Sequence, residues 1–232
     1  MKVVVPHGWN VSPREAMSIQ ERLRHKVVTV NVLGPVRTVA GVDIGFRHNL
    51  ARAAVVVLSY PDLAMEERAT AELPVQFPYV PGLLAFREAP ATLAAFEKLA
   101  VIPDLVIFDG QGLAHPRRLG IASHEGVLLD LPSIGCAKSR LCGEHQEPGN
   151  EPGAWSWLYD QGEVIGAVVR SKADADPLFV SIGHKVDLPT AIHYVLSCCR
   201  NNRLPETTRL AHLAAGEAHG MDQPRQRSLF EL

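Results

Sequence analysis

The sequence has no apolar run close to the roughly 20 residues that a membrane-spanning helix needs. Its N-terminus, MKVVVPHGW, is apolar only briefly before Pro6 and several polar residues follow. This pattern differs from a secretory signal, which combines a basic start with a longer apolar stretch. We therefore expect a cytoplasmic protein that has no membrane partner.

Cysteine is scarce, with four residues in the chain. Cys136 and Cys142 stand six positions apart, whereas Cys198 and Cys199 are adjacent. Neither spacing matches the short ligand loops of structural zinc sites. The pattern favours reduced thiols in or near the core.

The chain also lacks an excess of positive charge, because 23 Lys and Arg face 25 Asp and Glu for a net charge of −2. Proteins that grip long stretches of nucleic acid through phosphates are usually basic. Any nucleic-acid contact should therefore be local and helped by metal ions. The candidate local cations, each of which also suits a solvated surface cluster, are Arg117-Arg118, Lys138 to Arg140, His184-Lys185 and the run from Arg200 to Arg209.

No linker-like stretch, internal repeat or low-complexity tract divides the 232 residues, of which 47% are hydrophobic. That content is enough for a sizeable core. We predict a single domain over residues 1–220 and a flexible C-terminal tail over residues 221–232.

The order of predicted elements indicates an α/β fold. Its central sheet is mixed, an antiparallel meander followed by parallel strands, and helices flank both faces. Strands are predicted over 36–46, 51–60, 66–74, 105–109, 134–137, 155–159, 164–170 and 178–182. Helices are predicted over 12–25, 83–89, from Pro90 to about 99, and over 123–131, 187–199 and 205–219. The break at Pro90 follows from the poor αR geometry of a residue before proline.

Carboxylates occur within three apolar patterns. Asp43 interrupts AGVDIGF, Asp109 closes LVIFD, and Glu88 shares a helical face with Leu84. A buried carboxylate is costly unless it is paired or metal-bound, and ligands gather at the carboxyl ends of strands in α/β sheets. The alternatives are a strand-end Asp, a turn-forming Asp before glycine, and an exposed Glu paired with a neighbouring Arg or Lys.

Hard oxygen ligands of this kind suit Mg²⁺ or Mn²⁺. Such ions activate water and stabilise the charge that develops on a phosphodiester. Lys138, which follows the apolar run IGCA, is placed to neutralise that charge or to orient the water. An ordinary surface lysine is the alternative.

The stretch PYVPGLLAFREAP, from Pro78 to Pro90, joins a rigid aromatic turn to the Glu88 helix. Tyr79 between two prolines suits insertion into a nucleic-acid stack, although a tight structural turn explains it equally well. The segment DGQG permits close backbone approach to a ligand. A base extruded from a helix could be read there, near His115, which also suits a plain turn.

In sequence order, PYVPGLLAFREAP, DGQGLAHPRRLGIASH, IGCAKS, GAVVR and PLFVSIGHKVDLPTA resemble the conserved blocks of the endonuclease V family. The resemblance covers roughly Ala40 to His212. It implies a ribonuclease-H-like fold. It also implies Mg²⁺-dependent hydrolysis of the second phosphodiester 3′ to deoxyinosine, leaving 3′-hydroxyl and 5′-phosphate ends.

The resemblance assigns roles to individual residues. Asp43, Glu88 and Asp109 match the metal-binding carboxylates, Lys138 matches the catalytic lysine, and His212 falls where the family has an acidic residue or histidine near the metal. The strand-separating wedge matches Pro78, Tyr79, Val80 and Pro81. The hypoxanthine pocket and its flanks match Gly82, Leu84, Gly112, His115 and Gly120.

Some positions depart from the family pattern without removing a catalytic group. Glu125 replaces an apolar residue and would add negative charge near the pocket, Cys136 replaces valine and Gly45 replaces serine. Two other functions stay open, a ribonuclease acting on inosine in RNA and a non-catalytic nucleic-acid-binding module. The expected partner is DNA containing deoxyinosine, including single-stranded DNA or RNA, and the expected state is a monomer.

Overall fold

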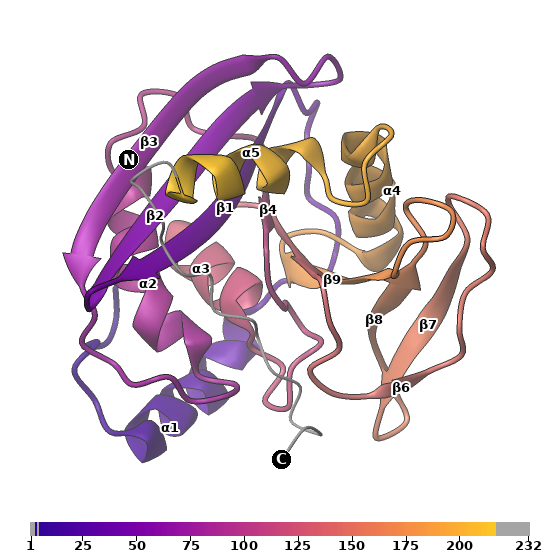
Figure 1. The fold of residues 1–232 in the computed structure, drawn as a ribbon. Coiled ribbons are helices and arrows are strands. Elements are labelled where there is room, and N and C mark those ends of the chain that lie inside the picture. The colour runs from indigo at the N-terminus through magenta and orange to yellow at the C-terminus, as the bar shows by residue number, and fades with distance from the viewer. Residues whose placement is uncertain (1–2, 4, 217–232) are drawn as a thin grey trace.

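One nine-stranded sheet organises the computed structural model, which describes residue 3 and residues 5–216 (Figure 1). The strand order is β3-β2-β1-β4-β5-β9-β8-β7-β6. The strands are β1 (Thr38–Arg47), β2 (Leu50–Ser59), β3 (Met65–Pro74), β4 (Leu105–Phe108), β5 (Ser133–Ala137), β6 (Glu144–His145), β7 (Trp155–Asp160), β8 (Glu163–Val169) and β9 (Leu178–His184).

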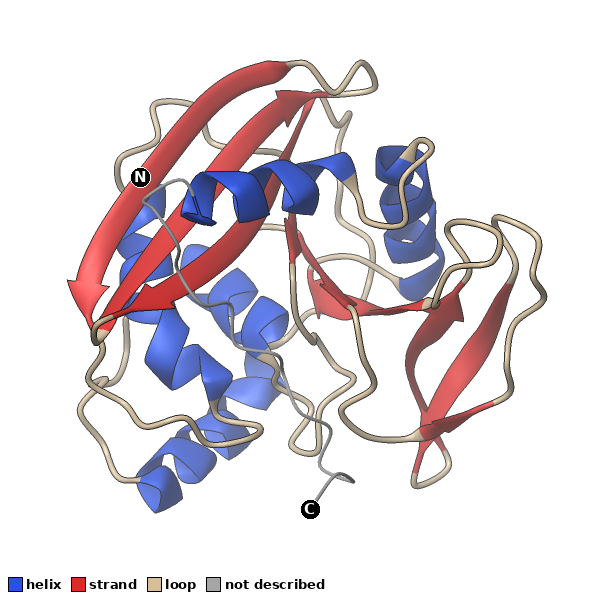
Figure 2. Ribbon diagram, in the orientation of Figure 1, coloured by secondary structure: helices blue, strands red, loops and turns tan. Residues whose placement is uncertain are grey.

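The sheet is mixed, as its sequence predicts. Strands β1 to β3 form an antiparallel meander, β4 and β5 run parallel to β1, and β9 returns antiparallel to β5. Helices lie on both sides of the sheet (Figure 2). They are α1 (Pro13–Leu23), α2 (Leu84–Phe96), α3 (Ile121–Leu129), α4 (Leu188–Cys199) and α5 (Glu206–Gly216), with a short 3₁₀ turn η1 at Arg24–Lys26.

Alternation along β1 separates two hydrophobic cores. Val42 and Ile44 belong to the core that the sheet shares with α2 and α3, whereas Val39 belongs to the core beneath α4 and α5. Successive side chains of a strand point to opposite faces. Asp43 therefore faces the α5 side, between two residues that face the α2 side.

The predicted helix break at Pro90 is wrong, because α2 runs unbroken through it. Proline removes one backbone hydrogen bond within a helix and strains the preceding turn. Ala89 and Ala91, on either side of it, are both buried in the same core. Packing on both sides of Pro90 therefore outweighs the cost of the lost hydrogen bond. The boundary predicted from the residue before proline is overridden by these tertiary contacts.

Side-chain capping fixes the start of two other helices. Ser12 and Glu15 form a reciprocal capping box on α1, and Asp187 accepts a hydrogen bond from the Thr190 backbone amide at the start of α4. The two-residue strand β6 was not predicted, because it is too short to show a period. All four cysteines are buried free thiols, as expected.

The chain ends limit two further predictions. The tail over residues 221–232 and the expected end of the last helix at His219 lie outside the described residues. The domain boundary at residue 220 thus stays a prediction. No helix between residues 5 and 216 is long and apolar enough to span a membrane.

Helix α5 lies against β1 at Gly41, and this contact generates a prediction. A Cβ atom at Gly41 would overlap the Thr207 backbone carbonyl of α5. Backbone cannot yield as a flexible side chain would, so Gly41→Ala should lower the free energy of unfolding by about 1–3 kcal/mol. Urea denaturation measures the change. Gly34→Ala, where no atom lies within 4 Å of the new Cβ, is the control. Equal stability of the two variants would contradict the tight contact.

Candidate active site

The parallel pairing of β1 and β4 brings Asp43 and Asp109 together. Val42 pairs with Phe108 in this register, so the next residue of each strand is a carboxylate. The Asp109 amide donates to the Val42 carbonyl at 3.4 Å, which continues the pairing by one residue. Both side chains are largely buried, with 9% and 14% of their surface exposed. Asp43 lies within β1 and Asp109 directly follows β4, and the parallel register of these two strands places the two carboxylates side by side.

Each of these carboxylates accepts a hydrogen bond from a basic side chain. His212 on α5 donates from Nδ1 to Asp43 Oδ2 at 2.9 Å, and this bond raises the pKa of His212. Lys138, directly after β5, donates from Nζ to Asp109 Oδ2. Burial alone would lower the pKa of Lys138, but the charge of Asp109 and its hydrogen bond raise it. Lys138 is therefore held as a cation beside the carboxylates.

Glu88 on α2 completes the group from the other side of the sheet. Only 7% of the residue is exposed, so the alternative of a solvated helix glutamate is wrong. Neighbouring Arg87 instead donates to the Phe77 carbonyl and stacks on the Phe46 ring. Burial raises the pKa of Glu88 well above its ordinary value, and the charge of Asp43 raises it further.

The chemistry of these side chains fits a hard divalent cation. Burial raises the pKa of Asp109 as well as that of Glu88, so each is costly to ionise without a positive charge nearby. Oxygen donors of this type are those that Mg²⁺ and Mn²⁺ prefer. Within the described part of the chain, no group of three or more His, Cys, Asp or Glu side chains is arranged so that it could hold a metal ion. Asp43 and Asp109 are turned toward His212 and Lys138 instead.

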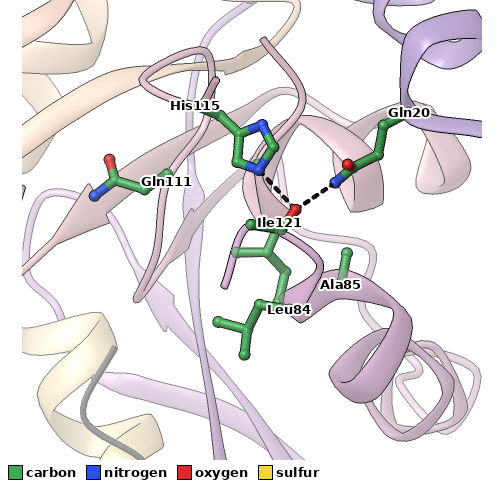
Figure 3. Close-up of a pocket in the computed structure, with 8 residues that line it drawn as sticks. Gln20, Leu84, Ala85, Gln111, His115 and Ile121 are labelled. Atoms are coloured by element: carbon green, nitrogen blue, oxygen red, sulfur yellow. Dashed lines mark hydrogen bonds between the residues drawn. The ribbon is translucent and has the colours of Figure 1, made fainter. Parts of the chain in front are cut away.

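A small pocket is built on the carbonyl of Gly82, and its lining includes Leu84, one turn before Glu88, and Gln111, two residues after Asp109. The carbonyl oxygen accepts from Gln20 Nε2 at 3.0 Å, His115 Nε2 at 2.8 Å and Arg117 Nη2 at 2.8 Å. Figure 3 shows Gln20 and His115 converging on this oxygen from opposite sides. The pocket is lined by Gln20, Gly82, Leu84, Ala85, Gln111, His115, Gly120 and Ile121.

Most of the predicted pocket residues therefore meet at one place. Gly82, Leu84, His115 and Gly120 line the pocket. Gly112 lies outside the lining and packs against the Ile182 carbonyl of β9, where a Cβ would overlap backbone. Its amide donates to Ser181 Oγ at 2.9 Å. Close packing against β9 therefore explains why a glycine is needed at position 112, which the sequence pattern alone did not reveal.

The segment from Pro78 to Pro81 leads directly into the pocket through Gly82. Phe77 is buried before it, and the Leu83 amide closes a turn onto the Val80 carbonyl at 2.9 Å. Tyr79 is 38% exposed at the tip. An aromatic side chain is thus presented at the surface on a turn that is anchored on both sides.

Sequence reasoning missed Gln20, the residue that ties α1 to the pocket. Its Nε2 donates to the carbonyls of Gly82 and Leu119, and its Oε1 accepts from Arg117 Nε at 2.6 Å. It is 1% exposed. The signal was present, because a polar amide stands in the apolar stripe of Ala16, Ile19 and Leu23 on α1.

Glu125 on α3 differs from its sequence interpretation. Both carboxyl oxygens are buried without a hydrogen-bond partner among the described residues. Burial raises the pKa of Glu125 well above its ordinary value, which favours the neutral acid. Because the neutral acid is favoured, Glu125 adds less negative charge near the pocket than the sequence suggested. Any charge that it does carry raises the pKa of Glu88.

His115 is fixed as a neutral ring, which generates a pH prediction. Its Nδ1 accepts from the Arg117 amide at 3.1 Å, so Nε2 must carry the proton donated to Gly82. Burial lowers the pKa of His115 from 6.5 to about 3. Between these values the unfolded chain binds more protons than the folded one. The stabilisation is therefore complete above pH 6.5 and is lost as the pH falls toward 3.

Replacing the His115 ring should reduce the loss of folding stability at acidic pH. His115→Gln should lose about 2 kcal/mol less stability than the wild-type protein between pH 7 and pH 5, whatever its absolute stability. Urea denaturation at pH 7, 6 and 5 measures both slopes. The buried acids Glu88 and Glu125 act in the opposite direction, but they are present in both proteins and cancel. Parallel slopes would show that His115 does not stay neutral in the folded state.

Comparison with known proteins identifies the family. A family model for Endonuclease V matches residues 21–213. An Endonuclease V from Trichormus variabilis is 54% identical over 214 residues, which cover 91% of this chain and 97% of that protein. One from Roseiflexus sp. RS-1 is 55% identical over 212 residues, which cover 91% and 95% of the two chains.

Solved structures agree with this sequence match. Endonuclease V from Streptomyces avermitilis is 40% identical with a TM-score of 0.87, over 94% of this chain and 97% of that chain. Endonuclease V from Ciona intestinalis, in complex with a 24mer DNA containing an inosine followed by a ribo-adenosine, is 30% identical with a TM-score of 0.77, over 88% and 96%. The predicted ribonuclease-H-like fold is confirmed, and the chain belongs to the endonuclease V family of DNA-binding repair nucleases.

Proposed function

We propose that this protein hydrolyses the second phosphodiester 3′ to deoxyinosine and leaves 3′-hydroxyl and 5′-phosphate ends. The observation that carries the proposal is the convergence of buried Asp43 and Glu88 with the largely buried Asp109, near a pocket lined by Leu84, Gln111 and His115. Asp43, Glu88 and Asp109 would hold Mg²⁺, and Mn²⁺ would substitute for it because both ions prefer oxygen ligands. When bound, such an ion supplies an activated water and stabilises charge on the reacting phosphate.

The chain's own cations have separate tasks in this proposal. Lys138 Nζ lies at the rim of the carboxylate group, where it neutralises a phosphate oxygen or orients the attacking water. His212 holds Asp43 Oδ2 in a fixed direction through its Nδ1 proton. Both act from rigid positions, at the end of β5 and on α5, so little reorganisation is needed at the moment of reaction.

Lesion recognition is assigned to the Gly82 pocket and the turn before it. A flipped hypoxanthine would enter between Leu84, Ile121 and His115, and the Tyr79 ring would fill the gap left in the stack. Enclosure of the base pays for its unstacking. The pocket is small and its backbone is pinned by three donors, which suits discrimination by shape and backbone contact.

A second candidate substrate is inosine in RNA. The Ciona relative binds DNA in which a ribo-adenosine follows the inosine, so a 2′-hydroxyl at that position fits that enzyme. Competition between matched inosine-DNA and inosine-RNA oligonucleotides distinguishes the two substrates. We place the protein in the cytoplasm as a monomer. A non-catalytic binding module is disfavoured because each expected carboxylate and Lys138 are present.

Inosine-dependent nicking tests the proposed reaction. With Mg²⁺, the purified protein should nick a duplex holding one inosine and leave its adenine counterpart intact. Asp43→Asn keeps the size of the side chain but removes the charge, so single-turnover nicking should fall at least about a hundredfold while inosine binding persists. Glu72→Gln, an exposed carboxylate on β3, is the matched control. A folded Asp43→Asn protein that nicks at the control rate would reject the metal role.

The aromatic tip is tested separately from the chemistry. Tyr79→Ala should weaken inosine-duplex binding about tenfold or more, because the stacking contact is worth roughly 1–3 kcal/mol, and Tyr79→Phe should retain most of it. Thermal unfolding should change little, since Tyr79 is partly exposed. Binding by fluorescence anisotropy and single-turnover rates measure the effect. Unaltered binding and rates in Tyr79→Ala would remove the wedge role and leave the structural turn.

A further inference from the structure

Strand β7 presents a stripe of exposed aromatic side chains that do not line the pocket. Trp155, Trp157 and Tyr159 are 41%, 40% and 43% exposed. Because they alternate along one strand, they point to the same face of the sheet. The two indole rings meet edge to face, with centroids 4.5 Å apart. Contiguous exposed apolar surface of this kind marks an interaction site more often than scattered single residues do.

The stripe begins where the helical cover ends. Trp155 pairs with Val169 and Trp157 pairs with Ala167, both fully buried in the core beneath α4 and α5. Helix α4 packs on β9 and β8. The tryptophans therefore continue the same face of the sheet outward, beyond the helix, into solvent.

The sheet register connects this stripe to Lys138. Ala137 pairs with Phe179, Phe179 with Val168, and Val168 with Ser156. One residue further on, the same row contains Lys138, Leu178, Val169 and Trp155. Cys136, Leu178 and Val169 share one core, so Lys138 and Trp155 emerge on the same face. Three strand spacings separate them, or about 14 Å.

Arg203 lies at the Lys138 end of this row. From the loop between α4 and α5, it donates to the carbonyls of Asp176 at 2.8 Å, Lys138 at 3.0 Å and Pro177 at 3.2 Å. Its guanidinium makes no ion pair with a carboxylate among the described residues, so its charge is not locally cancelled. The other end of the stripe differs, because Asp160 and Glu163 are there but both pair with Arg118.

We propose that Trp155, Trp157 and Arg203 bind unpaired nucleotides of the strand that leaves the cleavage centre. This inference rests on the proposed function, because it takes Lys138 as the origin of the path. Exposed indoles stack on any base, and a cation beside them holds phosphate. At 3.4 Å per nucleotide, 14 Å corresponds to about four nucleotides from Lys138, and to fewer in a stretched strand. Single-stranded DNA or RNA fits, because paired bases cannot offer their faces to the indoles.

The test uses inosine-free single-stranded DNA without metal, so its result does not depend on whether inosine is cut. Fluorescence anisotropy measures binding to the wild-type protein and to Trp155→Ala/Trp157→Ala. The double variant should bind at least about tenfold more weakly. The conservative pair Trp155→Phe/Trp157→Phe should recover most of that loss, since phenylalanine keeps a stacking face. Met65→Ala, an exposed apolar residue on β3 at the opposite end of the strand order, is the matched control and should bind as the wild type.

A second arm locates the path. Inosine duplexes with single-stranded extensions of two to ten nucleotides, on either side of the lesion, are bound in Ca²⁺. The wild-type protein should gain affinity with length on one side only, and the double alanine variant should lose that gain. Equal single-strand binding by the wild-type and double alanine proteins would overturn the proposal. So would a concentration-dependent dimer in sedimentation that the double variant abolishes, because the stripe would then bind a second copy of the chain.

Discussion

Burial of like charges is the constraint on which the candidate centre depends. The register between β1 and β4 sets Asp43, within β1, beside Asp109, directly after β4, and α2 adds Glu88 from the opposite core. Desolvation raises the cost of ionising Glu88 and Asp109. Such an arrangement persists in a folded protein only if nearby cations compensate. Lys138 and His212 supply part of that compensation, and their elements are held by the same sheet and by α5.

The compensation explains why α5 must sit so closely on β1. His212 reaches Asp43 only if the helix lies almost in contact with the strand backbone, and Gly41 makes that approach possible. Gly41 in β1 therefore permits the hydrogen bond between His212 and Asp43, which lies two residues further along the strand. The packing of α5 on β1 and the interaction of His212 with Asp43 therefore depend on each other.

Sequence reasoning reached the fold and the carboxylates for identifiable reasons. Asp43 and Asp109 interrupt or end apolar runs, and such a polar residue in a buried pattern is a strong local signal. Pro90 was misread because a local backbone rule was allowed to decide a boundary that tertiary packing decides. Gln20 was missed because it acts on backbone carbonyls that are distant in sequence. Side-chain periodicity does not predict such long-range hydrogen bonds, although the position of Gln20 within an apolar stripe of α1 can be seen in the sequence.

In the proposed function, the thirteen residues from Pro78 to Pro90 would combine recognition and chemistry in one short segment. Gly82 is pinned by donors from α1 and from the segment around His115. Helix α2 begins at Leu84, and Glu88 follows a little over one turn later. Movement of the Tyr79 turn would therefore be transmitted to the pocket and to Glu88 together. Because the unbroken helix through Pro90 is buried on both sides of the proline, a shift at either end costs packing at the other, and the Gly82 pocket and Glu88 keep a fixed separation.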